Sequence, residues 1–364
     1  MDESPRRQYA IPLTKPPIVT WALLCINVAV WLAMTLSGGS DDPDVLVLFG
    51  AKVNALIVLG EYWRLLTSCF LHVGIVHLAF NMYSLYILGT EAEAFYGRAR
   101  FIVIYLLSGL FGSLVSLALN PNLSAGASGA IFGLVGALAA FYWRQREAFG
   151  DVSQRRFANM IVIIGLNVLI GFTTPGIDNF AHLGGLVAGL ALGWQLCPRY
   201  EMAQQPDGSR SVVDDNGLRR QWWAVLLAIA LLVWCAFLFI NQQADSSDVH
   251  VFLGHQALQH GRLIPARAEF QAAVERAPDS AHAYFGLGHA CYDLHDYESA
   301  AAAYRRTLEL SSDWIDAHWN LALCYVQLDR IPEAIAALRA YIDANPGPDE
   351  VQKAQDLVAN LQKT

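Results

Sequence analysis

The chain has 364 residues, of which 55% are hydrophobic and only 15% are charged. Soluble domains average about 25% charged residues, so this composition indicates a membrane protein with a smaller soluble part. The net charge of −8 arises after residue 243, where 17 acidic residues accompany 9 basic ones, and this excess of acid argues against nucleic-acid binding.

Seven apolar runs in the first two thirds each approach the ~20 residues that a membrane-spanning helix needs. They begin near Ile18, His72, Phe101, Ser128, Ala158, Asn179 and Trp222. The first run follows a polar tail, residues 1–17, and shows no obvious small-residue cleavage site near Leu36. We therefore expect a retained anchor rather than a cleaved leader.

Basic residues alternate across the connections between these runs. They gather before the first run and between runs two and three, four and five, and six and seven, at Arg6, Arg7, Lys15, Arg98, Arg100, Arg144, Arg146, Arg155, Arg156, Arg199, Arg210, Arg219 and Arg220. The positive-inside rule then predicts a cytoplasmic N-terminus and an extracytoplasmic C-terminal third. The inner membrane of a bacterium is the expected location.

The second run carries two polar residues on one helix face. His77 and Asn81 are four residues apart, so their side chains point the same way and can donate hydrogen bonds to an oxyanion. A zinc site would use His72 and His77, but these are five apart, and the stretch has neither an HExxH motif nor a carboxylate. We expect no metal and no other cofactor.

Two further polar residues lie at membrane depth, where they indicate function. Ser128, in Gly126-Ala127-Ser128-Gly129, begins the fourth run, where helix N–H groups favour developing negative charge. His182, in Ala181-His182-Leu183-Gly184-Gly185, lies near the start of the sixth. Taken singly, close helix packing explains the serine and a satisfied polar contact explains the histidine. Asp178 either orients His182 or, as is commoner, caps the helix.

Together these motifs resemble the rhomboid family of intramembrane serine proteases. The matching segments occur in the family's order over about residues 18–197: Glu61–Arg64, Leu71-His72, His77–Asn81, Gly89–Gly97, Gly126–Gly129, and Ala181–Gly185 with Gly189. The resemblance implies that Ser128 is the nucleophile and His182 the general base. It also implies an oxyanion hole formed by His77, Asn81 and the Ser128 backbone N–H.

The resemblance assigns supporting positions as well. Phe132, one turn after Ser128, matches an aromatic position that packs against the catalytic histidine. Gly126 leaves little bulk around the Ser128 hydroxyl, and Gly185, with Gly189, allows close packing against a neighbouring helix. Trp63 and Arg64 match a characteristic pair of the long first connection, which we expect to hold structure rather than perform chemistry. That connection, from Asp41 to Ser68, mixes apolar runs with charges and is typical of segments lying partly in the interface.

Residues 245–364 repeat with a period of 34. The recurring sets are Leu253, Leu287 and Leu321; Gly254, Gly288 and Ala322; and Ala266, Ala300 and Ala334. This pattern resembles three tetratricopeptide repeats followed by a capping helix from Glu350 to Leu361. Such arrays bind proteins or peptides on a concave face, and the alternative is a spacing or solubilising appendage. Cys291 and Cys324 fall in adjacent repeats, where packing is a simpler role than a disulfide.

The predicted fold is all-α, a polytopic membrane helix bundle followed by an α-solenoid. Its parts are a rhomboid-like six-helix core at 18–197, a polar cytoplasmic linker at 198–220, a seventh transmembrane helix at 221–241 and the repeats at 245–364.

The predicted function is that of an intramembrane serine endopeptidase which cleaves transmembrane proteins near their outer end through an acyl-enzyme. Its partners would be such substrates, membrane lipid and a protein or peptide ligand of the repeats. The main alternative is a non-proteolytic scaffold that binds transmembrane clients. A transporter is disfavoured because the apolar runs hold no paired carboxylates.

Overall fold

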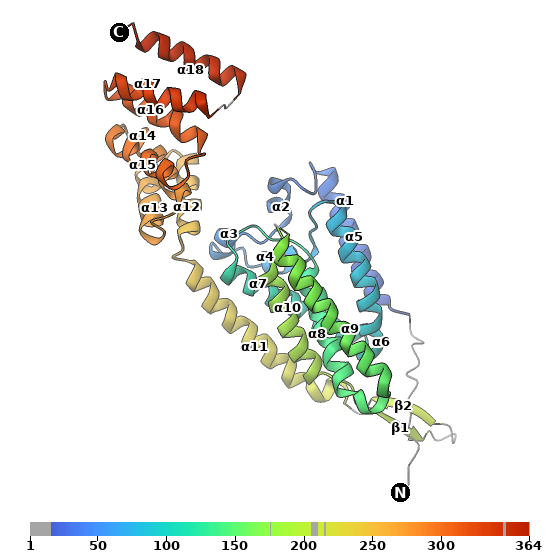
Figure 1. The fold of residues 1–364 in the computed structure, drawn as a ribbon. Coiled ribbons are helices and arrows are strands. Elements are labelled where there is room, and N and C mark those ends of the chain that lie inside the picture. Colours follow the sequence, from blue (N-terminus) through green and yellow to red (C-terminus); the bar gives the residue numbers. More distant parts are fainter. Residues whose placement is uncertain (1–15, 175, 205–209, 215, 345–346, 364) are drawn as a thin grey trace. The chain divides into compact units, whose positions relative to one another are not determined.

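A computed structural model describes residues 16–174, 176–204, 210–214, 216–344 and 347–363 (Figure 1). The chain divides into two compact units, Met1–Gln242 and Gln243–Thr364, and each is described by itself. Regular structure in the described residues is helical apart from one two-stranded hairpin, which confirms the all-α prediction. The predicted tail lies almost entirely outside the described residues.

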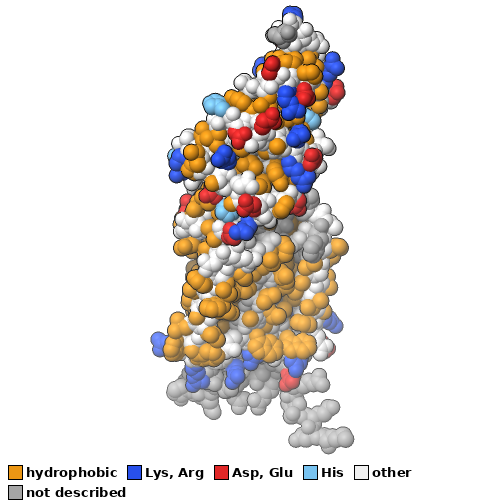
Figure 2. Space-filling model, turned by 90° about the vertical axis from the view of Figure 1, so that its left-hand side faces the viewer, with side chains coloured by type: hydrophobic (Ala, Val, Ile, Leu, Met, Phe, Trp, Pro, Cys, Tyr) orange, Lys and Arg blue, Asp and Glu red, His pale blue; other side chains and the backbone are white. Residues whose placement is uncertain are grey.

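The first unit is a bundle of long helices with short ones in its first connection. The helices are α1 Ile18–Leu36, α2 Pro43–Phe49, α3 Asn54–Val58, α4 Arg64–Thr67, the 3₁₀ turn η1 Ser68–Phe70, α5 Gly74–Ser84, the π-helical turn η2 Leu85–Gly89, α6 Thr90–Tyr96, α7 Arg98–Leu119, α8 Ser128–Arg144, α9 Arg146–Thr173, α10 Asn179–Gln195 and α11 Leu218–Gln243. The face seen in Figure 2 carries a broad apolar surface over this unit, whereas charged side chains are interspersed over the repeats.

Three described helices, α1, α7 and α11, are long and apolar enough to cross a membrane. A fourth span is possible if the pair Arg64–Phe70 and Gly74–Tyr96, bent by 90°, is counted as one. The remaining predicted runs differ from simple spans. Helices α8 and α10 have 17 residues each, about 25 Å at 1.5 Å per residue, which is shorter than the ~30 Å hydrocarbon layer. Helix α9 begins at Arg146 rather than near Ala158, because its charged first turns are helical too.

Helix α8 is the centre of the bundle. All its residues from Gly129 to Tyr142 are buried, between α7, α9 and α10. Its contact with α10 is made by backbone. A Cβ added at Gly185 would collide with the Gly129 carbonyl, and one at Gly189 would collide with the carbonyl of Gly133. We call this contact the glycine seam, defined by Gly129 and Gly133 on α8 and Gly185 and Gly189 on α10; small residues four apart allow such close approach in membrane helices.

The start of α1 is fixed by a buried carboxylate on α6. Glu93 accepts hydrogen bonds from the Val19 N–H at 3.1 Å, the Thr20 N–H at 2.8 Å and the Thr20 hydroxyl at 2.8 Å. Arg98 Nε lies 3.6 Å from the same carboxylate. The first N–H groups of a helix have no partner within the helix, so Glu93 supplies acceptors where α1 lacks them.

Glu93→Ala is expected to destabilise this unit by about 2–4 kcal/mol, because three donors lose their acceptor. The measurement is thermal denaturation of the purified protein in detergent. Glu147→Ala, at an exposed position in the first turn of α9, is the matched control and should leave the midpoint nearly unchanged. An equal effect of both substitutions would contradict the anchoring role.

The connection after α10, predicted as a polar linker at 198–220, contains a hairpin. Strands β1 Tyr200–Gln204 and β2 Arg210–Asp214 pair antiparallel, with Tyr200 opposite Asp214. The buried Arg100 of α7 pairs with Asp214 at 2.6 Å, which ties the hairpin to the bundle. The sequence Asp207-Gly208-Ser209, which is typical of a turn, lies outside the described residues.

The second unit consists of three helix pairs and a final helix, as tetratricopeptide repeats require. Its helices are α12 Ser247–Gln259, α13 Leu263–Arg276, α14 Ala281–Asp293, α15 Tyr297–Leu310, α16 Ile315–Gln327, α17 Ile331–Asp343 and α18 Pro348–Leu361. The 34-residue period is also present in the backbone conformation. The turn residues Gly261, His295 and Asp329 are 34 apart, and all have φ between 57° and 67°. A Cβ at Gly254 would come within 2.8 Å of the Phe270 ring, which explains the small residue there. Cys291 and Cys324 are buried, unpaired thiols.

Candidate active site

The segment before α8 is held by the first connection. Lys52 and Ser124 exchange backbone hydrogen bonds at 2.9 and 3.1 Å, and the Gly126 N–H donates to the Ser68 carbonyl at 2.8 Å. The Lys52 amine donates to the Asn120 carbonyl at 2.7 Å, and burial lowers the pKa of this amine to about 8 against a smaller opposing effect of Asp178. These contacts fix the chain that leads into Ser128.

Ser128 is the first residue of α8, and no side chain caps this helix end. The N–H groups of its first turn are therefore free to meet a ligand, and the helix dipole favours negative charge there. His77, on α5, lies beside the same point. A Cβ at Gly126 would be 3.0 Å from His77 Nε2 and 3.6 Å from Ser128 Oγ, so both polar groups flank this glycine. Gly126 has φ +147°, which a larger residue rarely adopts.

His182 lies on α10, which faces α8. Its ring stacks on Phe132, with ring centroids 4.4 Å apart and an interplanar angle of 12°. The residue after Ser128 touches the residue before His182, because a Cβ at Gly129 would be 3.3 Å from the Ala181 carbonyl oxygen. The contacts of these described residues include no hydrogen bond between Ser128 and His182. Catalytic hydrogen bonds are often long without substrate and shorten in the complex.

Asn81 is buried one turn after His77 on α5. Its amide donates to the His77 carbonyl at 3.0 Å, so one of its two N–H bonds is engaged within the helix. No other acceptor for this amide lies within hydrogen-bond distance among the described residues. His77 and Asn81 thus come from one helix, as the spacing predicts, and His77 lies beside Gly126 at the start of α8.

The Asp178 side chain caps α10, while its backbone carbonyl accepts a hydrogen bond from the His182 N–H at 3.2 Å. Its Oδ1 accepts from the Ala181 N–H at 3.0 Å, and its other oxygen accepts from the Ser116 hydroxyl of α7. Of the two roles considered for Asp178, this geometry favours the helix cap.

His72 and His77, the two residues that a zinc site would use, pack against each other. No group of three or more His, Cys, Asp or Glu side chains in the described part of the chain could hold a metal ion. His72 and His77 meet instead as an edge-to-face ring pair with centroids 5.3 Å apart.

The sequence comparisons decide the family. A family model described as Rhomboid domain matches residues 59–199. The putative rhomboid protease YdcA of Bacillus subtilis (strain 168) is 34% identical over 186 residues, which cover 50% of this chain and 88% of that protein. The chain belongs to the rhomboid family.

Other relatives of this rhomboid are longer than the matched region. The rhomboid protease GluP of Bacillus subtilis (strain 168) is 30% identical over 326 residues, which make up 90% of this chain and 61% of that protein. RHOMBOID-like protein 4 of Arabidopsis thaliana is 37% identical over 173 residues, 47% of this chain and 43% of that protein. The chain therefore spans about two fifths to three fifths of the length of these two relatives.

The second unit matches repeat families. Two family models described as tetratricopeptide repeat match residues 253–313 and 292–361 of this rhomboid, which confirms the repeat prediction. Among solved structures, the tetratricopeptide domain of Arabidopsis OM64 is 19% identical and covers 32% of this chain and 94% of its own, with a TM-score of 0.30.

Trp63 and Arg64 lie in the first connection of the rhomboid domain. Arg64 is buried, pairs with Glu61 at 2.6 Å and donates to the Val47 and Ala51 carbonyls at 2.7 and 3.2 Å. Its guanidinium also lies 4.7 Å from the centre of the Trp63 ring. These contacts join α2 to α4 and place neither side chain against Ser128.

Sequence reasoning missed part of the support around the site. Gly112 and Ser108 of α7 also touch the seam: a Cβ at Gly112 would be 2.7 Å from the Ala181 carbonyl, and Gly133 packs on Ser108. Gly129 and Gly133 have the same four-residue spacing as Gly185 and Gly189. This matching spacing could have indicated from the sequence that α8 and α10 pack closely.

Proposed function

We propose that this rhomboid is an intramembrane serine endopeptidase in which Ser128 attacks the scissile carbonyl and His182 serves as general base. One observation carries the proposal. Ser128 begins an uncapped helix with His77 beside it, while the facing helix presents His182 stacked on Phe132. This arrangement supports a nucleophile, a base and oxyanion donors acting together at one helix end, as acyl transfer requires.

The reaction would follow the general scheme for a serine nucleophile. His182 accepts the Ser128 proton as Oγ bonds to the carbonyl carbon, and the carbonyl oxygen becomes an oxyanion. His77, Asn81 and the Ser128 backbone N–H stabilise that charge. Collapse of the tetrahedral intermediate releases the amine, protonated by His182, and leaves an acyl-enzyme that water hydrolyses.

We further propose that the substrates are transmembrane proteins cut near their outer end. The alternating arginines support an inner-membrane orientation with a cytoplasmic N-terminus and extracytoplasmic repeats. In this arrangement the repeats would bind a substrate or partner protein outside the cytoplasm. Their three first helices, α12, α14 and α16, carry no Lys or Arg, so a ligand rich in carboxylates is disfavoured.

The test combines cleavage with covalent labelling. Purified full-length protein in liposomes is given a transmembrane reporter, and a fluorophosphonate probe is mapped by peptide mass spectrometry. We expect reporter cleavage and a probe adduct on Ser128. Stable binding of the reporter with neither cleavage nor adduct would favour the scaffold alternative.

The oxyanion donors provide a separate prediction. His77→Ala and Asn81→Ala are each expected to lower kcat for the reporter by about 10²–10³-fold, because one donor to the developing charge is lost. KM should change much less, since these groups act chiefly in the transition state. His260→Ala, an exposed histidine of the repeats, is the control. A change in KM alone would remove both residues from the oxyanion hole.

A further inference from the structure

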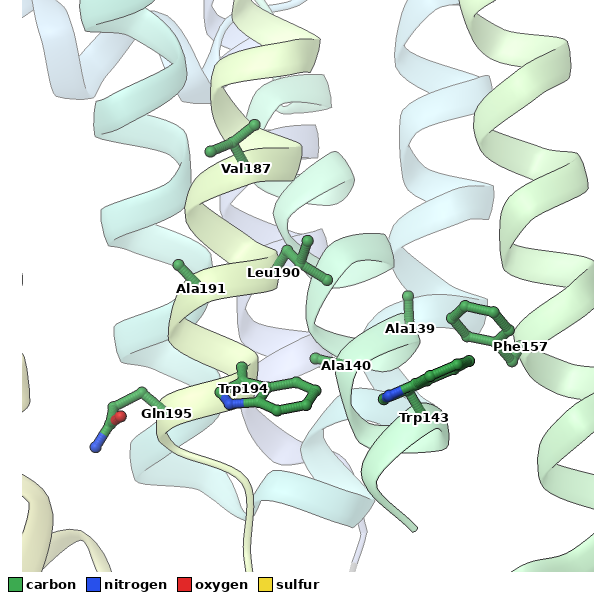
Figure 3. A pocket seen from close by; sticks show the side chains of 9 residues that line it. All are labelled: Ala139, Ala140, Trp143, Phe157, Val187, Leu190, Ala191, Trp194 and Gln195. Carbon is green, nitrogen blue, oxygen red and sulfur yellow. The ribbon is translucent and has the colours of Figure 1, made fainter. Parts of the chain in front are cut away.

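A groove far from the candidate active site has no role in the chemistry above. It measures about 760 Å³ and is lined by Ala139, Ala140, Trp143, Phe157, Val187, Leu190, Ala191, Trp194 and Gln195. Eight of these nine side chains are apolar, and the volume lies in the range of about 300–1,000 Å³ that is typical of small-ligand sites. Figure 3 shows Val187 at one end of the groove and both tryptophans at the other.

The groove exists because two helices flank α8 without closing on each other. Helix α9 packs on α8 but barely touches α10. Val187, Leu190, Ala191 and Trp194 are spaced three or four residues apart, so they share one face of α10 over about 10 Å. The alanines of α8 and α10 contribute little bulk, whereas Trp143, Phe157 and Trp194 contribute large rings (Figure 3). The result is a narrow apolar trough.

Two arginines stand at the tryptophan end of this trough. The Arg144 guanidinium lies 5.2 Å from the centre of the Trp194 ring, and that of Arg146 lies 5.0 Å from the Trp143 ring. Each donates one hydrogen bond to a backbone carbonyl, Arg144 to Trp194 at 2.6 Å and Arg146 to Trp143 at 2.8 Å. No carboxylate of the described residues forms an ion pair with either arginine, and each guanidinium has five N–H donors.

We propose that this groove is a binding site for an anionic phospholipid. An acyl chain lies along Val187, Leu190 and Ala191, and the phosphate group meets Arg144 and Arg146. Apolar lining and a paired positive charge at one end match the two chemical halves of such a lipid. Tryptophans are enriched at the level where headgroups meet hydrocarbon. Trp143 and Trp194 line the groove and each lies beside one of the two arginines, as this level requires.

A substrate helix fits the groove less well. Trp143 is 15 residues after Ser128 on α8, about 22 Å along the helix axis. The groove is therefore distant from the point where a scissile bond would meet Ser128. A helix with side chains is also about 10–12 Å wide, whereas the groove is walled by aromatic rings. The proposal does not depend on proteolysis. It places the lipid in the cytoplasmic leaflet only through the proposed orientation, which puts the Arg144 end of α8 on the cytoplasmic side.

Photocrosslinking tests the proposal on the full-length protein. The protein is reconstituted in phosphatidylcholine bilayers with a trace of phosphatidylglycerol that carries a diazirine in its acyl chain, and adducts are mapped after irradiation. We expect adducts to concentrate in 139–143 and 187–194. Unlabelled phosphatidylglycerol should compete with the probe, and added phosphatidylcholine should not.

Variants separate the two halves of the site. Arg144→Gln and Arg146→Gln should each reduce capture of the probe about fivefold, as expected for one charge at a membrane surface. Ala191→Phe should block the trough, because this exposed position faces it. Arg219→Gln, an exposed basic position at the start of α11, is the control and should leave capture unchanged. Thermal denaturation checks that each variant is folded.

Two outcomes would overturn the proposal. Adducts spread evenly over α1 and α11 and unaffected by Ala191→Phe would show that only general annular lipid was captured. Equal capture of a phosphatidylcholine probe, unchanged in the arginine variants, would show that the groove does not select an anionic headgroup.

Discussion

Replacing Ser128 by alanine is expected to lower kcat for a transmembrane reporter by about 10⁴-fold or more, and His182→Ala should have an effect of similar size. Alanine at 128 removes the atom that bonds to the carbonyl carbon. Alanine at 182 leaves the serine hydroxyl protonated and therefore weakly nucleophilic. Neither Ser128 nor His182 belongs to the glycine seam that joins α8 and α10, so both variants should stay folded.

The double variant distinguishes a catalytic pair from two independent contributions. If Ser128 and His182 act as one unit, Ser128→Ala combined with His182→Ala is no slower than either single variant. Initial rates in liposomes at saturating reporter provide the measurement, with Ser84→Ala and His260→Ala as controls for loss of a hydroxyl and an imidazole elsewhere. Undiminished cleavage in either single variant would refute the assignment of that residue.

Gly185→Ala is expected to cause the largest structural loss from a single methyl group. Its Cβ would collide with the Gly129 carbonyl, and backbone on both sides leaves no flexible side chain to move away. Overpacking of this kind costs about 1–3 kcal/mol. Because Gly185 is three residues after His182 and Gly129 directly follows Ser128, forced separation of α8 and α10 should also lower kcat.

The matched control is Gly165→Ala on α9. A Cβ there meets nothing within 4 Å, so the added methyl group is accommodated. Alanine favours a helix over glycine by about 0.5–1 kcal/mol, and the midpoint of thermal denaturation should rise or stay constant. Equal midpoints for Gly165→Ala and Gly185→Ala would contradict the close approach of α8 and α10.

Local signals in the sequence were sufficient for helix positions and for the repeats. Helices α1, α8 and α10 begin at the predicted residues Ile18, Ser128 and Asn179, because a proline, a glycine-rich segment and an aspartate cap precede them. The 34-residue period predicts both helix pairing and the small residues that fit against rings such as that of Phe270.

Features that depend on distant partners could not be predicted. The extension of α9 back to Arg146 places charged turns in a helix, which hydropathy alone does not identify. The hairpin after α10 depends on Arg100, more than a hundred residues away, pairing with Asp214. The bridge between Lys52 and Ser124 likewise joins two connections with no shared motif. In the candidate site, the residue types were evident from the sequence. The proximity of Gly126 to His77 could not be predicted, because it depends on how α5 packs against the segment before α8.

The glycine seam has a consequence for how such an enzyme could admit a substrate. Backbone-to-backbone contact makes α8 and α10 a nearly incompressible pair, with Ser128 and His182 carried on its two members. Helix α9 packs on α8 but scarcely touches α10, so it takes no part in the backbone contact. If other helices of the bundle move to admit a substrate, this contact would keep the distance between the proposed nucleophile and base constant. The four glycines of the seam would thereby hold the geometry of the proposed active site fixed.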